Sequence, residues 1–220
     1  MRFLVTRFTI RPVKPYPSIQ SSNGQKFREM DAYVFDKLDG SNLRFEYSRK
    51  QGWHKFGTRN RLFDHTDPDF GLAIPLFLEF WQDKLNQVIK SNRWDHLIVF
   101  MEFWGKNSFA GKHDRQDPKT LTLFDACPNK KGILGPKEFL DNFKHLRIAS
   151  FLGCFNWTRG FVDRIREGKD DLSPKVTFEG VVGKSGSGHK LVMAKAKTQT
   201  WIDKVLAQYG PIEGKKIVDS

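Results

Sequence analysis

Two strand-like runs flank the tetrapeptide Lys37-Leu38-Asp39-Gly40, and they constrain the fold of this chain more than any other stretch. Residues 32–35 lead into the lysine and residues 41–47 follow the glycine; aromatic and β-branched side chains are frequent in this part of the chain. Asp-Gly is a turn signal, so the pattern predicts a hairpin of two short strands with Lys37 at a strand end. Such a lysine can act as a covalent nucleophile if its pKa falls from about 10.4; the plain alternative is an exposed hairpin lysine.

The rest of the chain alternates between strand-like and helix-like segments. We expect further strands at residues 52–58, 97–104, 120–126, 176–184 and 190–196, with a looser strand at residues 1–10. Apolar side chains three and four apart predict one amphipathic helix over residues 72–90, and we expect other helices at residues 135–145, 157–167 and 200–209. We interpret residues 11–25 as an extended arm and residues 106–119 and 169–175 as loops. The mixture predicts an α+β fold with antiparallel strands around a cleft, in a single domain over residues 1–220.

The charge balance indicates the kind of partner. The sequence carries 37 lysine and arginine residues against 25 aspartate and glutamate residues, a formal net charge of +12. This balance favours a polyanion, either nucleic acid or nucleotide phosphates, over the plain alternative of a merely basic soluble protein. No stretch approaches the roughly 20 apolar residues of a membrane span, and no signal-peptide pattern is present, so we expect no membrane partner. Cys127 and Cys154 lack metal-ligand spacing, which favours a cytoplasmic location and leaves a virus-encoded origin open.

Several side chains have the chemistry that a nucleotide site needs. Glu102 and Glu179 each stand in a largely apolar run, where burying a carboxylate is costly unless it is paired or bound. Lys195 and Lys197 alternate with alanines, so both project from one face of a strand. Phe124 suits either the core or a stacking platform for a base. Taken singly, each has a plain alternative: a solvent-facing glutamate, a solvated lysine face and a core phenylalanine.

The order of these groups along the chain strengthens the interpretation that they form a nucleotide site. The sequence contains, in order, Lys37-x-Asp39-Gly40, Thr58-Arg59, Glu102-x-x-Gly105, Phe124-Asp125, Glu179-Gly180-Val181-Val182 and Lys195-x-Lys197. This series resembles motifs I, Ia, III, IIIa, IV and V of the covalent nucleotidyltransferase superfamily, which contains the ATP-dependent DNA and RNA ligases and the mRNA capping enzymes. The resemblance covers about residues 16–201. It implies an antiparallel-sheet, ATP-grasp-like nucleotidyltransferase domain with flanking helices.

The resemblance also implies a reaction, with ATP and Mg²⁺ or Mn²⁺ as cofactors. Lys37 would attack the α-phosphate of ATP, release pyrophosphate and form lysyl-N–AMP. AMP would then pass to the 5′-phosphate of a strand, and a 3′-hydroxyl would displace it. Lys195 and Lys197 would grip the α-phosphate while Glu179 binds the metal, and together these charges would lower the pKa of Lys37.

The remaining roles concern the base, the sugar and the acceptor strand. By position in the motifs, Phe124 would stack on the adenine and Glu102 would hold the ribose hydroxyls. Arg59 would contact phosphate or the acceptor strand, and Asn42 would join the nucleotide-binding residues.

Two features resemble one branch of the superfamily. Lys37-x-x-Gly40-x-Asn42 and the segment Tyr16-Pro17-Ser18-Ile19 are similar to the phage-type RNA ligases that seal nicks in duplex RNA. Residues 198–220 are too few for an OB-fold after the last motif, which argues against a capping enzyme. Such RNA ligases carry a C-terminal domain of their own, so an accessory protein could supply that surface here.

We therefore expect a monomeric ATP-dependent RNA ligase that acts on RNA or DNA strand ends, with nicked duplex as the first candidate substrate. A minimal ATP-dependent DNA ligase is the nearest alternative. A non-catalytic nucleic-acid-binding domain is the alternative from a different class.

Overall fold

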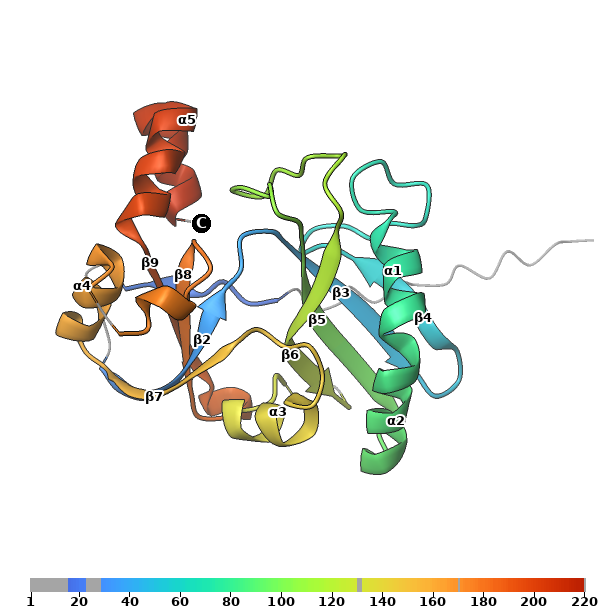
Figure 1. The fold of residues 1–220 in the computed structure, drawn as a ribbon. Helices are drawn as coiled ribbons and strands as arrows, with labels where there is room; N and C mark the ends of the chain where they lie inside the picture. The colour runs from blue at the N-terminus through green and yellow to red at the C-terminus, as the bar shows by residue number, and fades with distance from the viewer. Residues whose placement is uncertain (1–15, 23–28, 130–131, 170, 220) are drawn as a thin grey trace, which may run out of the picture.

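The structure is a computed structural model that describes residues 16–22, 29–129, 132–169 and 171–219. The strand expected at residues 1–10 and most of the extended arm lie outside these ranges. The α+β class predicted from the sequence is confirmed: two sheets face each other and helices flank them (Figure 1).

Sheet A has five strands in the order β1-β9-β8-β2-β7. Most neighbours are antiparallel, and only the short β1 runs parallel to its neighbour β9. The strands are β1 (Gln20–Ser21), β2 (Met30–Lys37), β7 (Phe151–Trp157), β8 (Gly180–Ser185) and β9 (Val192–Lys197).

Sheet B has four strands in the order β4-β3-β5-β6, and all its neighbours are antiparallel. The strands are β3 (Ser41–Ser48), β4 (Gly52–Gly57), β5 (His96–Trp104) and β6 (Thr120–Pro128).

The helices are α1 (Ala73–Phe80), α2 (Gln82–Asn92), α3 (Pro136–Phe143), α4 (Arg159–Glu167) and α5 (Gln199–Asp219). Helices α1 and α2 lie beside sheet B and α4 beside sheet A, whereas α3 lies below the two sheets and α5 stands above sheet A (Figure 1). On sheet B, Phe77 of α1 stacks on Phe45 with ring centroids 4.2 Å apart and is fully buried. On sheet A, Phe161 and Ile165 of α4 share a buried cluster with Val34. Within the described residues, no helix is both long and apolar enough to cross a membrane.

Three sequence predictions about these elements need correction. The helix expected over residues 72–90 is two helices, because the backbone of Trp81 leaves helical geometry at φ −122° and ψ −36°. The break lets both segments keep their apolar side chains on a twisted sheet. The strand expected from residue 176 begins only at Gly180. The helix expected at residues 200–209 is followed, after a kink at Gly210, by a further helical segment that reaches Asp219 and was not predicted.

The expected hairpin around Asp39-Gly40 is also wrong. β2 belongs to sheet A and β3 to sheet B, so the two strands do not pair with each other. Gly40 is needed because of a close backbone contact and not because of a hairpin turn. A Cβ atom at Gly40 would lie 2.5 Å from the carbonyl oxygen of Phe103 and 2.7 Å from Cβ of Trp104, both in β5. The segment from residue 38 to residue 40 is therefore a crossing between sheets that passes directly against β5.

We expect Gly40→Ala to lower the free energy of unfolding by about 1–3 kcal/mol, because the added methyl group would overlap the β5 backbone. Gly160→Ala in α4 is the matched control, because its nearest neighbour would be Arg164 at an ordinary 3.7 Å. Urea denaturation at one pH measures both. Equal midpoints for Gly40→Ala and wild type would contradict the close approach.

Candidate functional site

A cavity of about 300 Å³ lies between the two sheets beside the crossing. All eight site residues predicted from the sequence line it: Lys37, Asn42, Arg59, Glu102, Phe124, Glu179, Lys195 and Lys197. Sheet A and the residue just before β8 contribute one wall, whereas β3, β5, β6 and the turn after β4 contribute the other. The fold thus brings residues from distant parts of the chain to one place, although it does not by itself assign their roles.

The centre of the cavity wall is an ion-paired cluster. The ammonium nitrogen of Lys37 donates to Oε2 of Glu179 at 2.7 Å, and the other oxygen, Oε1, lies 3.3 Å from Nζ of Lys197. Glu179 is only 5% exposed and Lys197 only 4%. One buried carboxylate is therefore shared by two lysines from different strands, which satisfies charges that would be costly to bury unpaired.

The protonation state of Lys37 differs from the sequence-based expectation. Burial disfavours its charged form, but the attraction of Glu179 and Glu102 outweighs burial, so the pKa of Lys37 is raised. We expected neighbouring cations to lower it; the side chains of the site alone have the opposite effect. Positive charge that engages Glu179 and Glu102 would be needed to release the proton from Lys37.

Two other groups titrate near neutral pH. Burial and the nearby Lys197 and Lys37 lower the pKa of Lys195 to about 8. Burial raises the pKa of Glu102 to about 8, against the opposing attraction of Lys37 and a hydrogen bond from the backbone N–H of Gly40. At pH 7 Glu102 is therefore mostly a neutral carboxyl group that can donate as well as accept a hydrogen bond.

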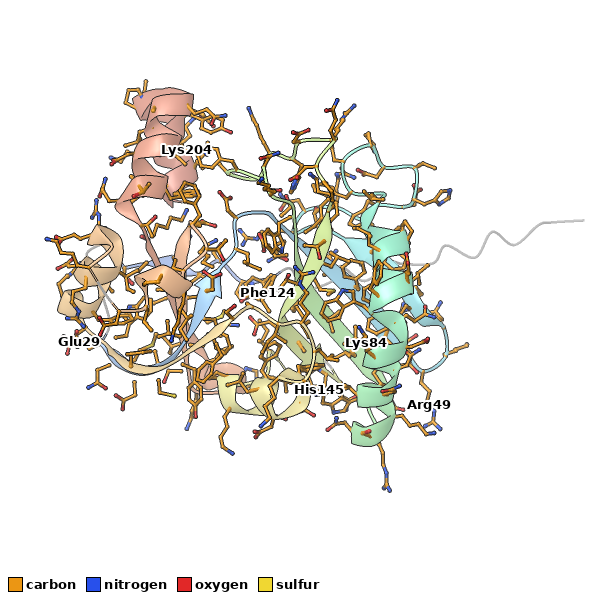
Figure 2. The ribbon with its side chains drawn as sticks, in the orientation of Figure 1. Glu29, Arg49, Lys84, Phe124, His145 and Lys204 are labelled. Atoms are coloured by element: carbon orange, nitrogen blue, oxygen red, sulfur yellow. The ribbon has the colours of Figure 1, made fainter. Side chains whose placement is uncertain are left out.

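Phe124 faces the cavity because β6 carries an irregularity. Phe100 lies opposite Asp125 and Met101 lies opposite Leu123, so Phe124 is an extra residue without a partner across the ladder. Bulges of this kind often re-aim a side chain next to a functional site. The half-buried ring lines the cavity between the two sheets (Figure 2).

The two remaining predicted residues lie at different depths. Asn42 is half-buried in β3, directly opposite Glu102 in the β3–β5 register. Arg59 is exposed in the turn after β4 and lies close enough to Lys195 to help lower its pKa. Arg59 is thus placed at the rim of the cavity rather than within its wall.

Sequence reasoning missed a buried polar group that supports Phe124. Lys184 of β8 donates to Oδ1 of Asp125 at 2.7 Å and to the carbonyl oxygen of Phe124 at 2.8 Å. The hydroxyl of Tyr16 donates to the other carboxylate oxygen of Asp125, and the Tyr16 ring contacts the edge of Phe124. These contacts make Asp125 the ion-pair partner of Lys184. The signal available in the sequence was a lysine inside the apolar run of β8.

The donor set suits a metal only in part. Among the described residues, no three histidine, cysteine, aspartate or glutamate side chains gather into a metal-binding group. Mg²⁺ bound together with a nucleotide typically uses one or two carboxylates plus phosphate oxygens and water. Glu179, which already holds two cations, fits that smaller role.

The fold is similar to the folds of several solved structures at low sequence identity. An archaeal ATP-dependent RNA ligase superposes with a TM-score of 0.65 and 19% identity, over 94% of this chain and 56% of that one. A protein from Aquifex aeolicus, provisionally assigned as an ATP-dependent DNA ligase, gives 0.61 and 20%, over 93% and 57%. A lysine-to-alanine variant of the Naegleria gruberi RNA ligase, solved with ATP and Mn, gives 0.58 and 18%, over 88% and 59%. This chain therefore spans somewhat more than half the length of these proteins.

These likenesses define the class of fold. The chain has the fold of the nucleotidyltransferase domain of ATP-dependent ligases, as the motif series implied. No protein-family model and no curated protein matches the sequence, so the assignment of the fold comes from structure.

We expect Glu102→Gln to be more stable than wild type at pH 8.5 by at least about 1.4 kcal/mol, the equivalent of one pKa unit. Between pH 4.5 and about 8 the folded protein keeps the Glu102 proton that the unfolded chain loses, so wild-type stability falls as the pH rises. Glutamine mimics the protonated form and removes that loss. Urea unfolding at pH 5.5 and 8.5 measures the gap, with Glu138→Gln on the exposed side of α3 as control. A gap that does not widen with pH would contradict the raised pKa.

Proposed function

We propose that this chain is the nucleotidyltransferase domain of an ATP-dependent polynucleotide ligase, and more narrowly of an RNA ligase that joins 3′-hydroxyl and 5′-phosphate ends. The observation that carries the proposal is the cluster of Lys37, Glu179, Lys195 and Lys197 on one cavity of about 300 Å³. A ligase fold alone would not support an active enzyme, whereas a lysine paired with a carboxylate beside two further lysines provides the groups that nucleotidyl transfer needs.

In the proposed first step, Lys37 first loses its ammonium proton, and its neutral side-chain nitrogen then forms a bond to the α-phosphorus of ATP while the bond to the β-phosphate bridging oxygen breaks. Pyrophosphate leaves and lysyl-N–AMP remains. We propose that Lys195 and Lys197 stabilise negative charge on the α-phosphate oxygens, which is supported by their position in the cavity lining. A divalent metal bound with the nucleotide would supply further positive charge on the phosphates, and we propose Glu179 as the carboxylate that would hold it.

In the next two steps the AMP moves to the strand. A 5′-phosphate oxygen attacks the AMP phosphorus and releases Lys37, which creates an adenylylated strand. A 3′-hydroxyl then attacks the 5′-phosphorus and releases AMP. We propose that Phe124 stacks on the adenine and that neutral Glu102, with Asn42 opposite it, bonds the ribose hydroxyls.

The partner of this domain is proposed to be RNA or DNA strand ends at a nick in duplex. A formal charge of +12 and the exposed Arg59 at the cavity rim support phosphate contacts. We further propose a monomer of one domain whose remaining strand-binding surface is supplied by an accessory protein. Sealing of this kind serves RNA repair.

We expect incubation with ATP and Mg²⁺ to add one AMP to Lys37, because Lys37 lines the cavity together with Lys195 and Lys197, which can stabilise charge on the α-phosphate. Intact-mass spectrometry with peptide mapping measures the adduct. Lys37→Ala should lose it completely, and Glu179→Ala should form it about 10²–10³-fold more slowly. Lys84→Ala on α2, on the outer side of sheet B, is the matched control and should react like wild type (Figure 2).

An adduct that survives in Lys37→Ala would overturn the proposed nucleophile. A wild-type protein that binds nicked duplex without ever forming the adduct would instead support the non-catalytic nucleic-acid-binding alternative.

The choice between RNA and DNA depends on the acceptor sugar. The likeness to a provisionally assigned DNA ligase keeps a minimal DNA ligase as the second candidate. We expect sealing of pre-adenylylated nicks to be fastest when the strand with the 3′-hydroxyl is RNA, because a 2′-hydroxyl beside the nick offers a further hydrogen-bond partner. Single-turnover rates on four matched nicks, with RNA or DNA on each side, measure this preference. Equal or faster sealing of the all-DNA nick would favour the DNA ligase.

A further inference from the structure

Helix α5 reaches the cavity through two of its residues. Trp201, in the first turn, is 2% exposed and lines the cavity. The helix is interrupted at Gly210, where φ is 73° and ψ is 173°, and beyond this kink Ile217 lines the same cavity. Both halves of α5 therefore contribute to the wall that also carries Lys197.

Among the residues that the structure describes, the contacts of the Lys197 ammonium group include two that come from α5. Nζ lies 4.2 Å from the centroid of the Trp201 ring and 3.3 Å from the carbonyl oxygen of Ile217. Another contact is with Oε1 of Glu179, at 3.3 Å. An aromatic face attracts a buried cation most strongly when water is excluded, and Lys197 is only 4% exposed. The ring of Trp201 thus restricts where this ammonium group can lie.

The N–H edge of the same indole contacts the crossing that follows Lys37. Its Nε1–H donates to Oδ2 of Asp39 at 2.7 Å, and Oδ1 of Asp39 accepts from the backbone N–H of Ala110 at 2.8 Å. Trp201 is therefore a rigid bridge between the last residue of β9 and the turn that begins one residue after β2.

We propose that Trp201 is a positioning residue, whose ring aims Lys197 into the cavity while its N–H fixes the Asp39 turn. The inference rests on the proposed roles of Lys37 and Lys197. Because the indole is rigid and has a contact at each end, it sets the distance between Lys37 and Lys197, which both act at the α-phosphorus atom in the proposed reaction. Small displacements of such groups slow a reaction strongly.

A purely structural role would leave a different signature. Trp201 also packs on Phe109 in a small buried cluster, with ring centroids 6.1 Å apart. If packing were its whole contribution, replacing it would slow the reaction by the same factor whichever lysine of β9 was present. If it acts through Lys197, its effect depends on that lysine.

The test is a double-mutant cycle on the single-turnover rate of AMP transfer to Lys37. Trp201→Leu is made in wild type, in Lys197→Met and in Lys195→Met, the matched background two residues earlier on the same strand face. We expect Trp201→Leu to slow transfer about tenfold in wild type and in Lys195→Met. In Lys197→Met the further loss should shrink to less than about threefold, because the group that Trp201 positions is gone. A tenfold loss in all three backgrounds would overturn the proposal.

A second pair of variants separates the two ends of the indole and avoids a large cavity. Trp201→Phe keeps an aromatic face near Lys197 but removes the N–H that reaches Asp39. It should slow transfer by less than Asp39→Ala, which also removes the acceptor of the Ala110 N–H, and it should add no further loss when the two are combined. Losses that multiply would show that the indole N–H does not act through Asp39. If wild type forms no lysyl-N–AMP at all, the proposed function fails, whereas a normal wild-type rate with additive losses refutes only the role of Trp201.

Discussion

The site depends on the crossing of the chain from sheet A to sheet B at Asp39-Gly40. Gly40 passes so close to β5 that no side chain fits there, and its N–H donates to Glu102 on that strand. Asp39 holds the backbone of Ala110 on one side and the indole of Trp201 on the other. The crossing thus joins both sheets, the loop after β5 and α5 at the point where Lys37 enters the cavity.

Around that crossing, the charges of the site are balanced by ion pairs between Glu179 and two lysines. Glu179 is shared by Lys37 and Lys197, and removing either cation would leave a buried charge less well compensated. The pairing explains why Lys37 stays protonated although it is enclosed. Burial, together with repulsion from Lys197 and Lys37, lowers the pKa of Lys195 to about 8. Engagement of Glu179 by another cation would shift this balance toward a neutral, nucleophilic Lys37.

The two ends of the cavity differ in character because different elements build them. The ionic end comes from β9, the residue before β8 and the crossing. At the other end, the bulge in β6 presents Phe124, and the buried Lys184–Asp125 pair with Tyr16 holds that segment against sheet A. A charged end beside an aromatic end matches the phosphates and the base of a nucleotide, which is the basis of the proposed function.

The local sequence pattern by itself was enough to predict several strands, one helix and the set of residues that line the cavity. Strong periodicity and aromatic content were enough for β3, β5, β6 and α3, and the ordered series from Lys37 to Lys197 was enough to choose residues that share one cavity. Periodicity and aromatic content depend only on neighbouring residues, and the motif series depends only on the order of residues along the chain. Both can therefore be recognised in the sequence without knowledge of the fold. β7 was missed because Gly153 adopts φ 134° within it, where the register also shifts, and this irregularity interrupts the alternation of a strand.

Only the tertiary structure decided which strands are partners and how the charges interact. The Asp-Gly signal is the same for a hairpin and for a crossing between sheets, since what distinguishes them is the approach of β5 to Gly40. The raised pKa of Lys37, the pairing of Lys184 with Asp125 and the bridge made by Trp201 all depend on side chains far apart in sequence. Their energies arise from distance and burial in three dimensions, and neither quantity is encoded in the spacing of residues along the chain.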